Sequence, residues 1–157
     1  MEYEQLLQSE LGELEIIREE LQNKEYRGMI VKTAKDGTMT RTRLAKKTDK
    51  KAGYFVAFWE KDEFGKNCPF DENDSADFLC IVVIDDDLNG IDDLNGIFVF
   101  PRQCLIEKGI LTSEAGIGKM AARFYPTWCQ DLNKTARKTQ AWQQAYFKNY
   151  SIRKEDH

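Results

Sequence analysis

The sequence predicts a single domain of the α+β (α/β-like) class, in which a mixed, mostly antiparallel central sheet is flanked by an N-terminal and a C-terminal helix. The chain has 157 residues, of which 41% are hydrophobic and 32% charged, and this suits one globular unit with a sizeable core. Apolar residues recur at helical spacing near both ends of the chain. Short apolar or alternating runs, separated by turn residues, fill the region between them.

Residues 1–25 are expected to form an amphipathic helix, followed by the main domain over residues 26–150 and a disordered tail over residues 151–157. Between Leu6 and Leu21, leucine and isoleucine recur at steps of three and four residues, with Gly12 as a weak point. Glutamates are concentrated in this first segment. We interpret them as a solvated outer face, with a partner-binding face as the alternative.

Short segments with the pattern of strands occupy residues 28–32, 38–44, 54–59, 77–84, 97–100 and 119–125. Asp36-Gly37 is expected to join the first two as a hairpin turn, because both residues tolerate positive φ. A short helix is expected over residues 101–107, with Pro101 in its first turn and Gly109 beyond its end. The last helix is expected over residues 135–148.

A basic segment begins in the second of these strands. Arg41 and Arg43 alternate with threonines, so both guanidinium groups should lie on one face of the strand. Four lysines follow in the next loop, namely Lys46, Lys47, Lys50 and Lys51. Such groups are typical of contacts with phosphate oxygens, although a solvated hairpin tip has the same composition. The net charge of −4 does not exclude this interpretation, because the acidic residues are concentrated elsewhere.

The hexapeptide DDLNGI occurs twice in succession, at residues 86–91 and 92–97. Asn-Gly is a preferred hairpin pair, so one copy predicts a turn, and the second copy is expected to lengthen the connection. The segment also resembles the opening of a calcium-binding loop, but Gly96 stands where the bidentate glutamate belongs. Its candidate ligands are Asp85, Asp87, Asn89 and Asp93. A solvated turn is the alternative, and we expect no cofactor.

The cysteines and the single histidine limit the possible chemistry. Cys68, Cys80, Cys104 and Cys129 lie far apart with no CxxC pair, which favours reduced thiols over a zinc site. The only histidine is His157, so Ser-His-Asp and Cys-His catalysis are excluded. The sequence contains neither an apolar run long enough to span a bilayer nor a signal pattern at its start. We therefore predict a cytoplasmic protein without a membrane partner.

Several motifs together resemble those of the MepB family. The first is Arg43-Leu-Ala45-Lys46, followed by Thr48, Lys50, Lys51, Gly53, Phe55, Val56 and Trp59. The others are Pro69-Phe70, Asp77-Phe78, Gly96-Ile-Phe98-Val-Phe100-Pro101, Lys108-Gly109-Ile110, Gly118-Lys119, Arg123-Phe-Tyr125-Pro126-Thr-Trp128 and Lys138-Thr139-Gln140-Ala-Trp142-Gln143 with Tyr146-Phe147. The resemblance covers roughly residues 40–148 in the expected order, which makes it specific.

The resemblance implies a small bacterial protein, with some relatives encoded beside a regulator and a multidrug efflux pump. It also implies a restriction-endonuclease-like core and, by analogy of fold alone, nucleic-acid binding. Nucleases of that architecture hold magnesium with clustered carboxylates, commonly in a carboxylate-x-Lys motif. Here Leu44-Ala45-Lys46 keeps the lysine and lacks the carboxylate, and Asp77 is either a lone metal ligand or a turn residue. We therefore expect no catalytic residues.

Two functions remain open. The first is non-catalytic binding of nucleic acid, DNA rather than RNA, through Arg41, Arg43, Lys46, Lys47, Lys50, Lys51, Lys119, Arg123 and Tyr125. Candidates for stacking on bases are Tyr54, Trp59, Tyr125 and Trp128, with core packing as the alternative. The second function is that of a metal-dependent nuclease-like enzyme or a binder of a small anionic ligand, whose pocket would gather the same basic residues with Gln140.

Overall fold

The computed structural model describes residues 1–74, 76–86 and 92–153, and its main sheet has the order β1-β2-β3-β8-β9-β11, with β12 also paired to β9. The strands are β1 (Leu14–Glu19), β2 (Met29–Thr33), β3 (Met39–Leu44), β8 (Phe78–Asp86), β9 (Asp92–Pro101), β11 (Phe147–Asn149) and β12 (Ile152–Arg153). Strand β3 runs parallel to β8, and the other described pairs of this sheet are antiparallel. The predicted mixed, mostly antiparallel sheet is therefore confirmed.

Two smaller sheets and a few helices complete the domain. One small sheet has the order β10 (Ala121–Phe124), β5 (Tyr54–Ala57) and β4 (Lys46–Lys47). The other pairs β6 (Glu60–Lys61) with β7 (Asn67–Cys68). The helices are α1 (Tyr3–Leu11), α2 (Arg102–Glu107) and α3 (Lys134–Gln143), with short 3-10 turns η1 (Lys24–Tyr26) and η2 (Gln144–Tyr146).

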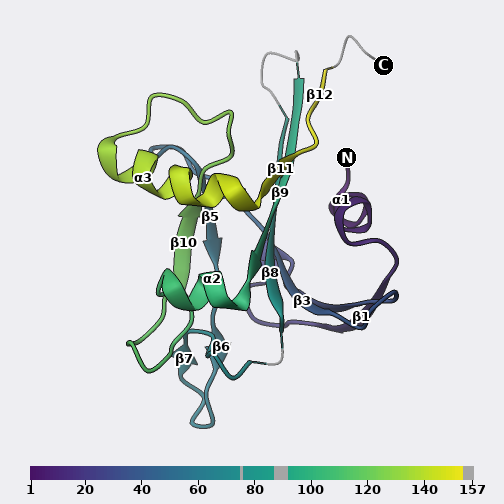
Figure 1. The fold of residues 1–157 in the computed structure, drawn as a ribbon, viewed down its shortest axis with the longest axis vertical. Coiled ribbons are helices and arrows are strands. Elements are labelled where there is room, and N and C mark those ends of the chain that lie inside the picture. The colour runs from purple at the N-terminus through teal and green to yellow at the C-terminus, as the bar shows by residue number, and fades with distance from the viewer. Residues whose placement is uncertain (75, 87–91, 154–157) are drawn as a thin grey trace.

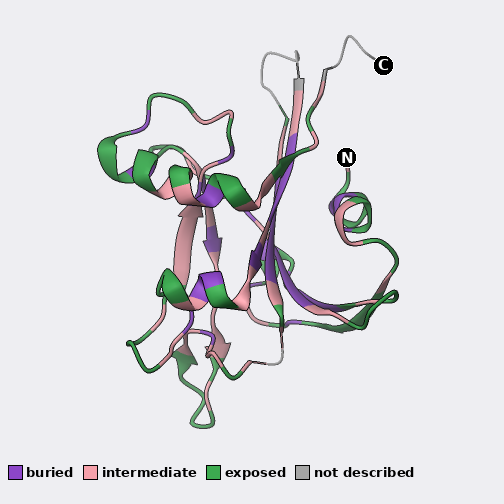
Figure 2. Cartoon of the chain, viewed as in Figure 1, coloured by how far each residue is buried: buried purple, intermediate pink, exposed green. Residues whose placement is uncertain are grey.

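The main sheet separates two apolar cores. Helix α1 covers one face, where its Leu6 and Leu7 pack with Val31, Val82 and Ile97 from three strands. The small β10-β5-β4 sheet, α2 and α3 lie on the other side of the main sheet (Figure 1). Buried residues accordingly follow β8 and β9, while much of α3 is exposed (Figure 2). The sequence predicted the apolar strand β8, whose central residues 79–83 are buried because the strand is covered on both faces.

The hairpin and the short helix predicted in the middle of the chain are confirmed. Strands β2 and β3 pair antiparallel around Gly37, which has φ of 74°. Helix α2 begins after Pro101 and ends before Gly109, which has φ of 69°. Both glycines occupy the left-handed region, where a side chain is unfavourable.

The predicted helix over residues 1–25 is wrong beyond Leu11. Gly12 has φ of 81°, so the helix ends there, and Leu14–Glu19 forms the edge strand β1 against β2. The three-and-four spacing continues past Gly12, but pairing with β2 decides the conformation. This difference determines where Glu20 lies, because the residue follows directly after the strand.

The C-terminal predictions also need correction. Helix α3 ends at Gln143 rather than at residue 148, and Phe147–Asn149 forms β11 against β9. Gly96 permits this pairing, because a Cβ at that position would collide with the ring of Phe147. Ile152–Arg153 pairs with β9 as β12, so the expected disordered tail is wrong for these residues, and residues 154–157 lie outside the described part.

The repeated hexapeptide does not form one long connection. Strand β9 begins at Asp92 and includes the second copy, with Asp93 opposite Asp86 and Asn95 opposite Ile84. The prediction that the strand begins at Ile97 is therefore wrong. Antiparallel pairing between β8 and β9 extends beyond the apolar residues 97–100 and includes the polar residues Asp93 and Asn95. Residues 87–91 lie outside the described residues. No helix in the described part of the chain is long and apolar enough to cross a membrane.

Candidate functional site

The two arginines of β3 lie inside the protein rather than on its surface. Arg41 is 3% exposed and Arg43 is 0% exposed. Nε of Arg41 lies 3.1 Å from Oε1 of Glu20, and Nη1 of Arg43 lies 2.8 Å from the same oxygen. Arg41 also donates to Asp74, and its guanidinium lies 3.8 Å from the ring centroid of Phe70. Arg41 and Arg43 do lie on one face of β3, as predicted, but that face is buried.

This burial removes Arg41 and Arg43 from the accessible cations. Glu20, which enters the interior where β1 ends, pairs with both arginines, and Asp74 and Glu60 supply further negative charge to Arg41. Arg43 also lies tightly against Gly28, since a Cβ at Gly28 would meet the guanidinium group. The cluster thus ties the segment after β1 to the parallel strand pair, and its role in this structure is to hold the fold.

The lysines that follow β3 remain on the surface. Lys46 and Lys47 form β4, and Lys50 and Lys51 lie in the turn before β5, all of them exposed. Nζ of Lys47 lies 3.4 Å from Oδ2 of Asp85. The described residues provide no salt-bridge partner for the other three. We call residues 46–51 the lysine loop.

Strand register connects the lysine loop with β10. Lys46 and Arg123 both pair with Phe55, one from each side of β5. Side chains of directly opposed residues leave a sheet on the same face, so the two cations flank the Phe55 ring. Arg123 also reaches the loop itself. Its Nη2 donates to Oγ1 of Thr48 at 2.9 Å, and its Nη1 donates to the carbonyl of Ala52 at 3.2 Å.

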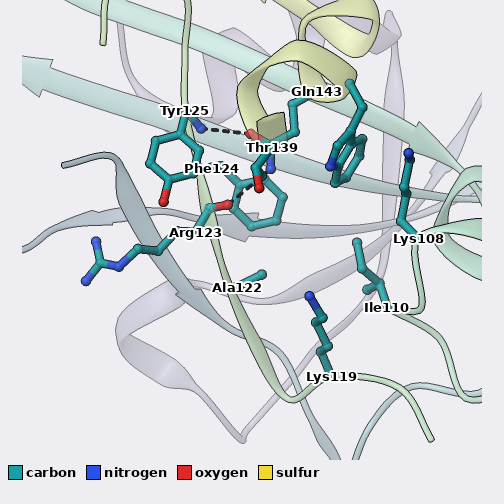
Figure 3. A pocket seen from close by; sticks show the side chains of 10 residues that line it. Lys108, Ile110, Lys119, Ala122, Arg123, Phe124, Tyr125, Thr139 and Gln143 are labelled. Carbon is teal, nitrogen blue, oxygen red and sulfur yellow. Dashed lines mark hydrogen bonds between the residues drawn. The ribbon is translucent and has the colours of Figure 1, made fainter. Parts of the chain in front are cut away.

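A hollow of about 190 Å³ lies beside Arg123, between α2, β10 and α3. It is lined by Lys108, Ile110, Lys119, Ala122, Arg123, Phe124, Tyr125, Thr139, Trp142 and Gln143. Lys119 extends between Ala122 and Ile110, whereas the Arg123 guanidinium points away from Lys119 (Figure 3). The hollow is therefore lined by Lys108 after α2, Lys119 before β10 and Arg123 within β10, and no described residue contributes a carboxylate to it.

The segment that carries Lys119 is fixed by the backbone. The amide of Lys119 donates to the carbonyl of Ile110 at 2.9 Å, and the amide of Gly118 donates to Oγ1 of Thr112 at 2.9 Å. A Cβ at Gly118 would collide with the backbone of residues 110–112. Glycine is therefore required at this position. The close approach of the two backbone segments fixes the position of the Lys119 backbone.

A second, wider hollow adjoins the first along α3. It shares Lys108, Thr139 and Trp142 with the first and adds Lys134 and Lys138. Trp142 is partly buried, and Nζ of Lys108 lies 5.2 Å from its ring centroid. We define the basic groove as these two hollows with their five cations, Lys108, Lys119, Arg123, Lys134 and Lys138. No carboxylate lines either hollow among the described residues.

Gln143 holds the two sides of the groove together. Its side chain is 1% exposed. Oε1 accepts from the amide of Tyr125 at 2.9 Å, and Nε2 donates to the carbonyl of Arg123 at 3.1 Å (Figure 3). Gln140 is committed as well, because its amide donates to the carbonyls of Pro126 and Cys129. These amides hold the end of β10 and the segment that follows it against α3, and they are bonded to the backbone rather than free for a ligand.

Two of the four proposed calcium ligands, Asp85 and Asp93, lie in the described part of the chain. Oδ2 of Asp85 accepts from the Tyr54 hydroxyl at 2.6 Å and also faces Lys47. Asp93 lies within β9, and Asp87 and Asn89 lie outside the described residues. Among the described residues, no three histidine, cysteine, aspartate or glutamate side chains are arranged to hold a metal ion.

The aromatic candidates have different environments. Burial raises the pKa of the Tyr54 hydroxyl, which donates to Asp85 and accepts from Nε1 of Trp128 at 2.9 Å. Trp128 also packs edge-on against Phe147. The rings of Tyr54 and Trp128 therefore both belong to the interior packing. Trp59 is partly buried beneath Lys61. Tyr125 does line the groove, as expected for a contact residue.

Sequence reasoning missed four members of the groove, namely Lys108, Lys134, Lys138 and Trp142. Lys108, Lys138 and Trp142 occur in the motifs that carry the family resemblance, and this was the available signal. Their distance in the sequence from the lysine loop hid their membership of one groove. Trp142 packs on Phe100, with 5.6 Å between ring centroids, and its ring also lines both hollows.

The fold and the groove define an α+β protein whose mixed sheet supports a strongly basic surface. A MepB-like family model matches residues 20–149, so the chain belongs to the MepB-like family, and the resemblance seen in the sequence is confirmed. A solved crystal structure of MepB is 44% identical, with a TM-score of 0.80, over 96% of this chain and 98% of that chain. No curated protein matches the chain.

Proposed function

We propose that the protein binds nucleic acid, with DNA as the first substrate to test, through phosphate contacts along the basic groove and the adjoining lysine loop. One observation carries the proposal. Arg123 lines the groove and is hydrogen-bonded to the lysine loop, so the two sets of cations form a continuous surface. Lysine and arginine on such a surface neutralise phosphates and release the counterions condensed on them.

The distribution of acidic residues supports this surface. Other hollows of the described structure are lined by carboxylates, including Glu19 and Glu20 in one and Glu60, Asp71 and Asp74 in another. The basic groove has none in its lining. The protein is acidic overall, with a net charge of −4, so this separation gives it one face suited to a polyanion.

The shape of the groove favours a polymer over a small anionic ligand. The hollow beside Arg123 has about 190 Å³, less than the roughly 300–1,000 Å³ of pockets that enclose a small molecule, whereas the second hollow has about 760 Å³ and lies within that range. The second hollow is nevertheless open along α3 and does not close over a ligand. A chain of phosphates can lie across both hollows and reach the lysine loop.

We propose binding without hydrolysis. The groove supplies cations and aromatic rings. In the segment Leu44-Ala45-Lys46, Leu44 stands where the carboxylate-x-Lys motif of nucleases has its carboxylate. A restriction-endonuclease-like core stays part of this proposal, and the parallel pair within the mixed sheet is compatible with it. The four free cysteines fit the cytoplasmic location that we infer for a nucleic-acid-binding protein.

A charge-matched pair of variants tests the proposal. The variant Lys119→Gln/Lys138→Gln removes two groove cations, and Lys32→Gln/Lys35→Gln removes two exposed cations around the β2–β3 hairpin. Labelled mixed-sequence DNA is titrated with each protein and followed by fluorescence anisotropy. We expect the groove variant to lose on the order of tenfold in affinity, and the hairpin variant to bind like the wild type.

Equal affinity of the two variants would show that charge alone, and not its position, determines binding. Absence of binding by the wild-type protein at low salt would contradict the proposal altogether. Circular dichroism of both variants checks that the exposed substitutions leave the fold unchanged, as their surface positions lead us to expect.

A further inference from the structure

We propose that the basic groove binds single-stranded nucleic acid and holds one unpaired base against the indole of Trp142. The proposal rests on the proposed function and adds to it the class of polymer and the residue that contacts the base. It arises from one juxtaposition, in which a partly exposed aromatic ring lies among five cations and no lining carboxylate.

Trp142 lies where the two hollows of the groove meet. Residues that line both hollows include Trp142 itself, Lys108 and Thr139. The indole is fixed from the core side by Phe100, whose ring centroid lies 5.6 Å away. A ring that is supported from within and accessible from the groove can serve as a stacking platform.

Lys108 is the group that a base would displace. Its Nζ lies 5.2 Å from the Trp142 ring centroid, and the residue is exposed. The described residues give Lys108 no carboxylate partner, so no ion pair opposes its displacement. An exposed cation–ring contact is weaker than the stacking of a base on tryptophan. The displaced ammonium group stays beside the groove and becomes available to a phosphate.

The arrangement of cations matches a backbone that passes over the ring. Lys119 and Arg123 belong to the hollow on the β10 side, and Lys134 and Lys138 belong to the hollow along α3. Phosphates on both sides of a stacked base would thus find cations. In a duplex the bases are paired and stacked on one another, so their faces are not available to the indole.

The groove offers few groups to read a base sequence. Both ends of the Gln143 amide are bonded to the backbone of β10. The Thr139 hydroxyl donates to the carbonyl of Thr135 at 3.2 Å. Stacking therefore accounts for the base contact and hydrogen bonding does not, which leads us to expect binding to single strands with little sequence preference.

The test compares oligonucleotides that differ only in their bases. A thymidine oligonucleotide of about ten nucleotides, an abasic one of the same length and charge, and a duplex are titrated with the wild-type protein. We expect the thymidine strand to bind on the order of tenfold tighter than the abasic strand. Because the charges are equal, this difference reports on the bases alone and requires no variant.

Two tryptophan variants locate the contact. Trp142→Leu is expected to bind the thymidine and abasic strands equally. Trp59→Leu is the matched control, because Trp59 also lies beneath a lysine, with 5.3 Å between Nζ of Lys61 and its ring centroid, and does not line the groove. This control is expected to retain the preference for bases.

Each outcome separates the two proposals. Equal wild-type affinity for the thymidine and abasic strands, or duplex binding as tight as single-strand binding, would overturn the base contact and leave phosphate binding intact. A preference lost in Trp59→Leu and kept in Trp142→Leu would also overturn it. Failure to bind any of the three nucleic acids would overturn the proposed function together with this inference.

Discussion

Nη1 of Arg43 lies 2.8 Å from Oε1 of Glu20, and both side chains are withdrawn from solvent. The same oxygen accepts from Nε of Arg41, so one carboxylate is shared by two arginines of β3, and Asp74 is a second partner of Arg41. Glu20 follows the edge strand β1, whereas Arg41 and Arg43 belong to β3, which pairs in parallel with β8. The cluster therefore joins the edge of the sheet to its centre.

Glu20→Gln is expected to destabilise the fold by about 3–5 kcal/mol, because it leaves two buried guanidinium groups with less negative charge than they need. Glu19→Gln changes the same charge at an exposed neighbouring position and should alter stability by no more than about 0.5 kcal/mol. Urea unfolding followed by circular dichroism measures both. Equal unfolding midpoints would mean that the cluster contributes no more than a surface charge does.

Gln143→Leu is expected to lower the free energy of unfolding by about 1–3 kcal/mol for each backbone group left without a partner. The two groups are the amide of Tyr125 and the carbonyl of Arg123. Gln144→Leu, at the next and exposed position, serves as the control. If thermal unfolding shows both variants at the wild-type midpoint, the amide of Gln143 does not hold β10 to α3 as described.

Gly96→Ala is expected to destabilise the protein by about 1–3 kcal/mol, since the added methyl group collides with the Phe147 ring. Shortening the opposing side chain in Gly96→Ala/Phe147→Leu should restore part of the loss, which a double-mutant cycle detects as a coupling. Additive effects in chemical unfolding would be inconsistent with the close packing of β11 on β9.

Cys129 provides a prediction on pH. Burial raises the pKa of its thiol from the ordinary 9.0 to about 11. Between these values the folded thiol keeps its proton while the unfolded thiol loses it, so this group makes the fold less stable as pH rises across that window. Alkylation of Cys129 by iodoacetamide, resolved by mass spectrometry, should have its midpoint near pH 11 in the native protein. A native midpoint equal to that in urea would contradict the burial argument.

The sequence indicated the alternation of Arg41 and Arg43 but not the direction in which their shared face points. Strand periodicity places both side chains on one face and is silent about what covers it. The covering residue, Glu20, was expected within an outer helical face, because leucine spacing continues past Gly12. Once that segment is a strand, Glu20 follows it into the interior, and the arginines become part of the fold rather than of its surface.

The groove was only partly predictable for a different reason. Lys119, Arg123 and Tyr125 were expected to act together, and they do line one hollow. Lys108 follows α2 and Trp142 belongs to α3, and the two side chains meet directly, with 5.2 Å between Nζ and the ring centroid. Such proximity is set by long-range contacts, which a local pattern does not contain. The apolar run of β8 was readable because burial on both faces leaves a local signature.

The dependence of DNA affinity on salt tests the central claim most directly. If the five groove cations contact phosphates, the logarithm of the association constant should fall linearly with the logarithm of salt concentration, with a slope of about −3 to −5. Lys119→Gln/Lys138→Gln should make that slope shallower by between one and two. A slope near zero for the wild-type protein, or the same steep slope for this variant, would contradict the account.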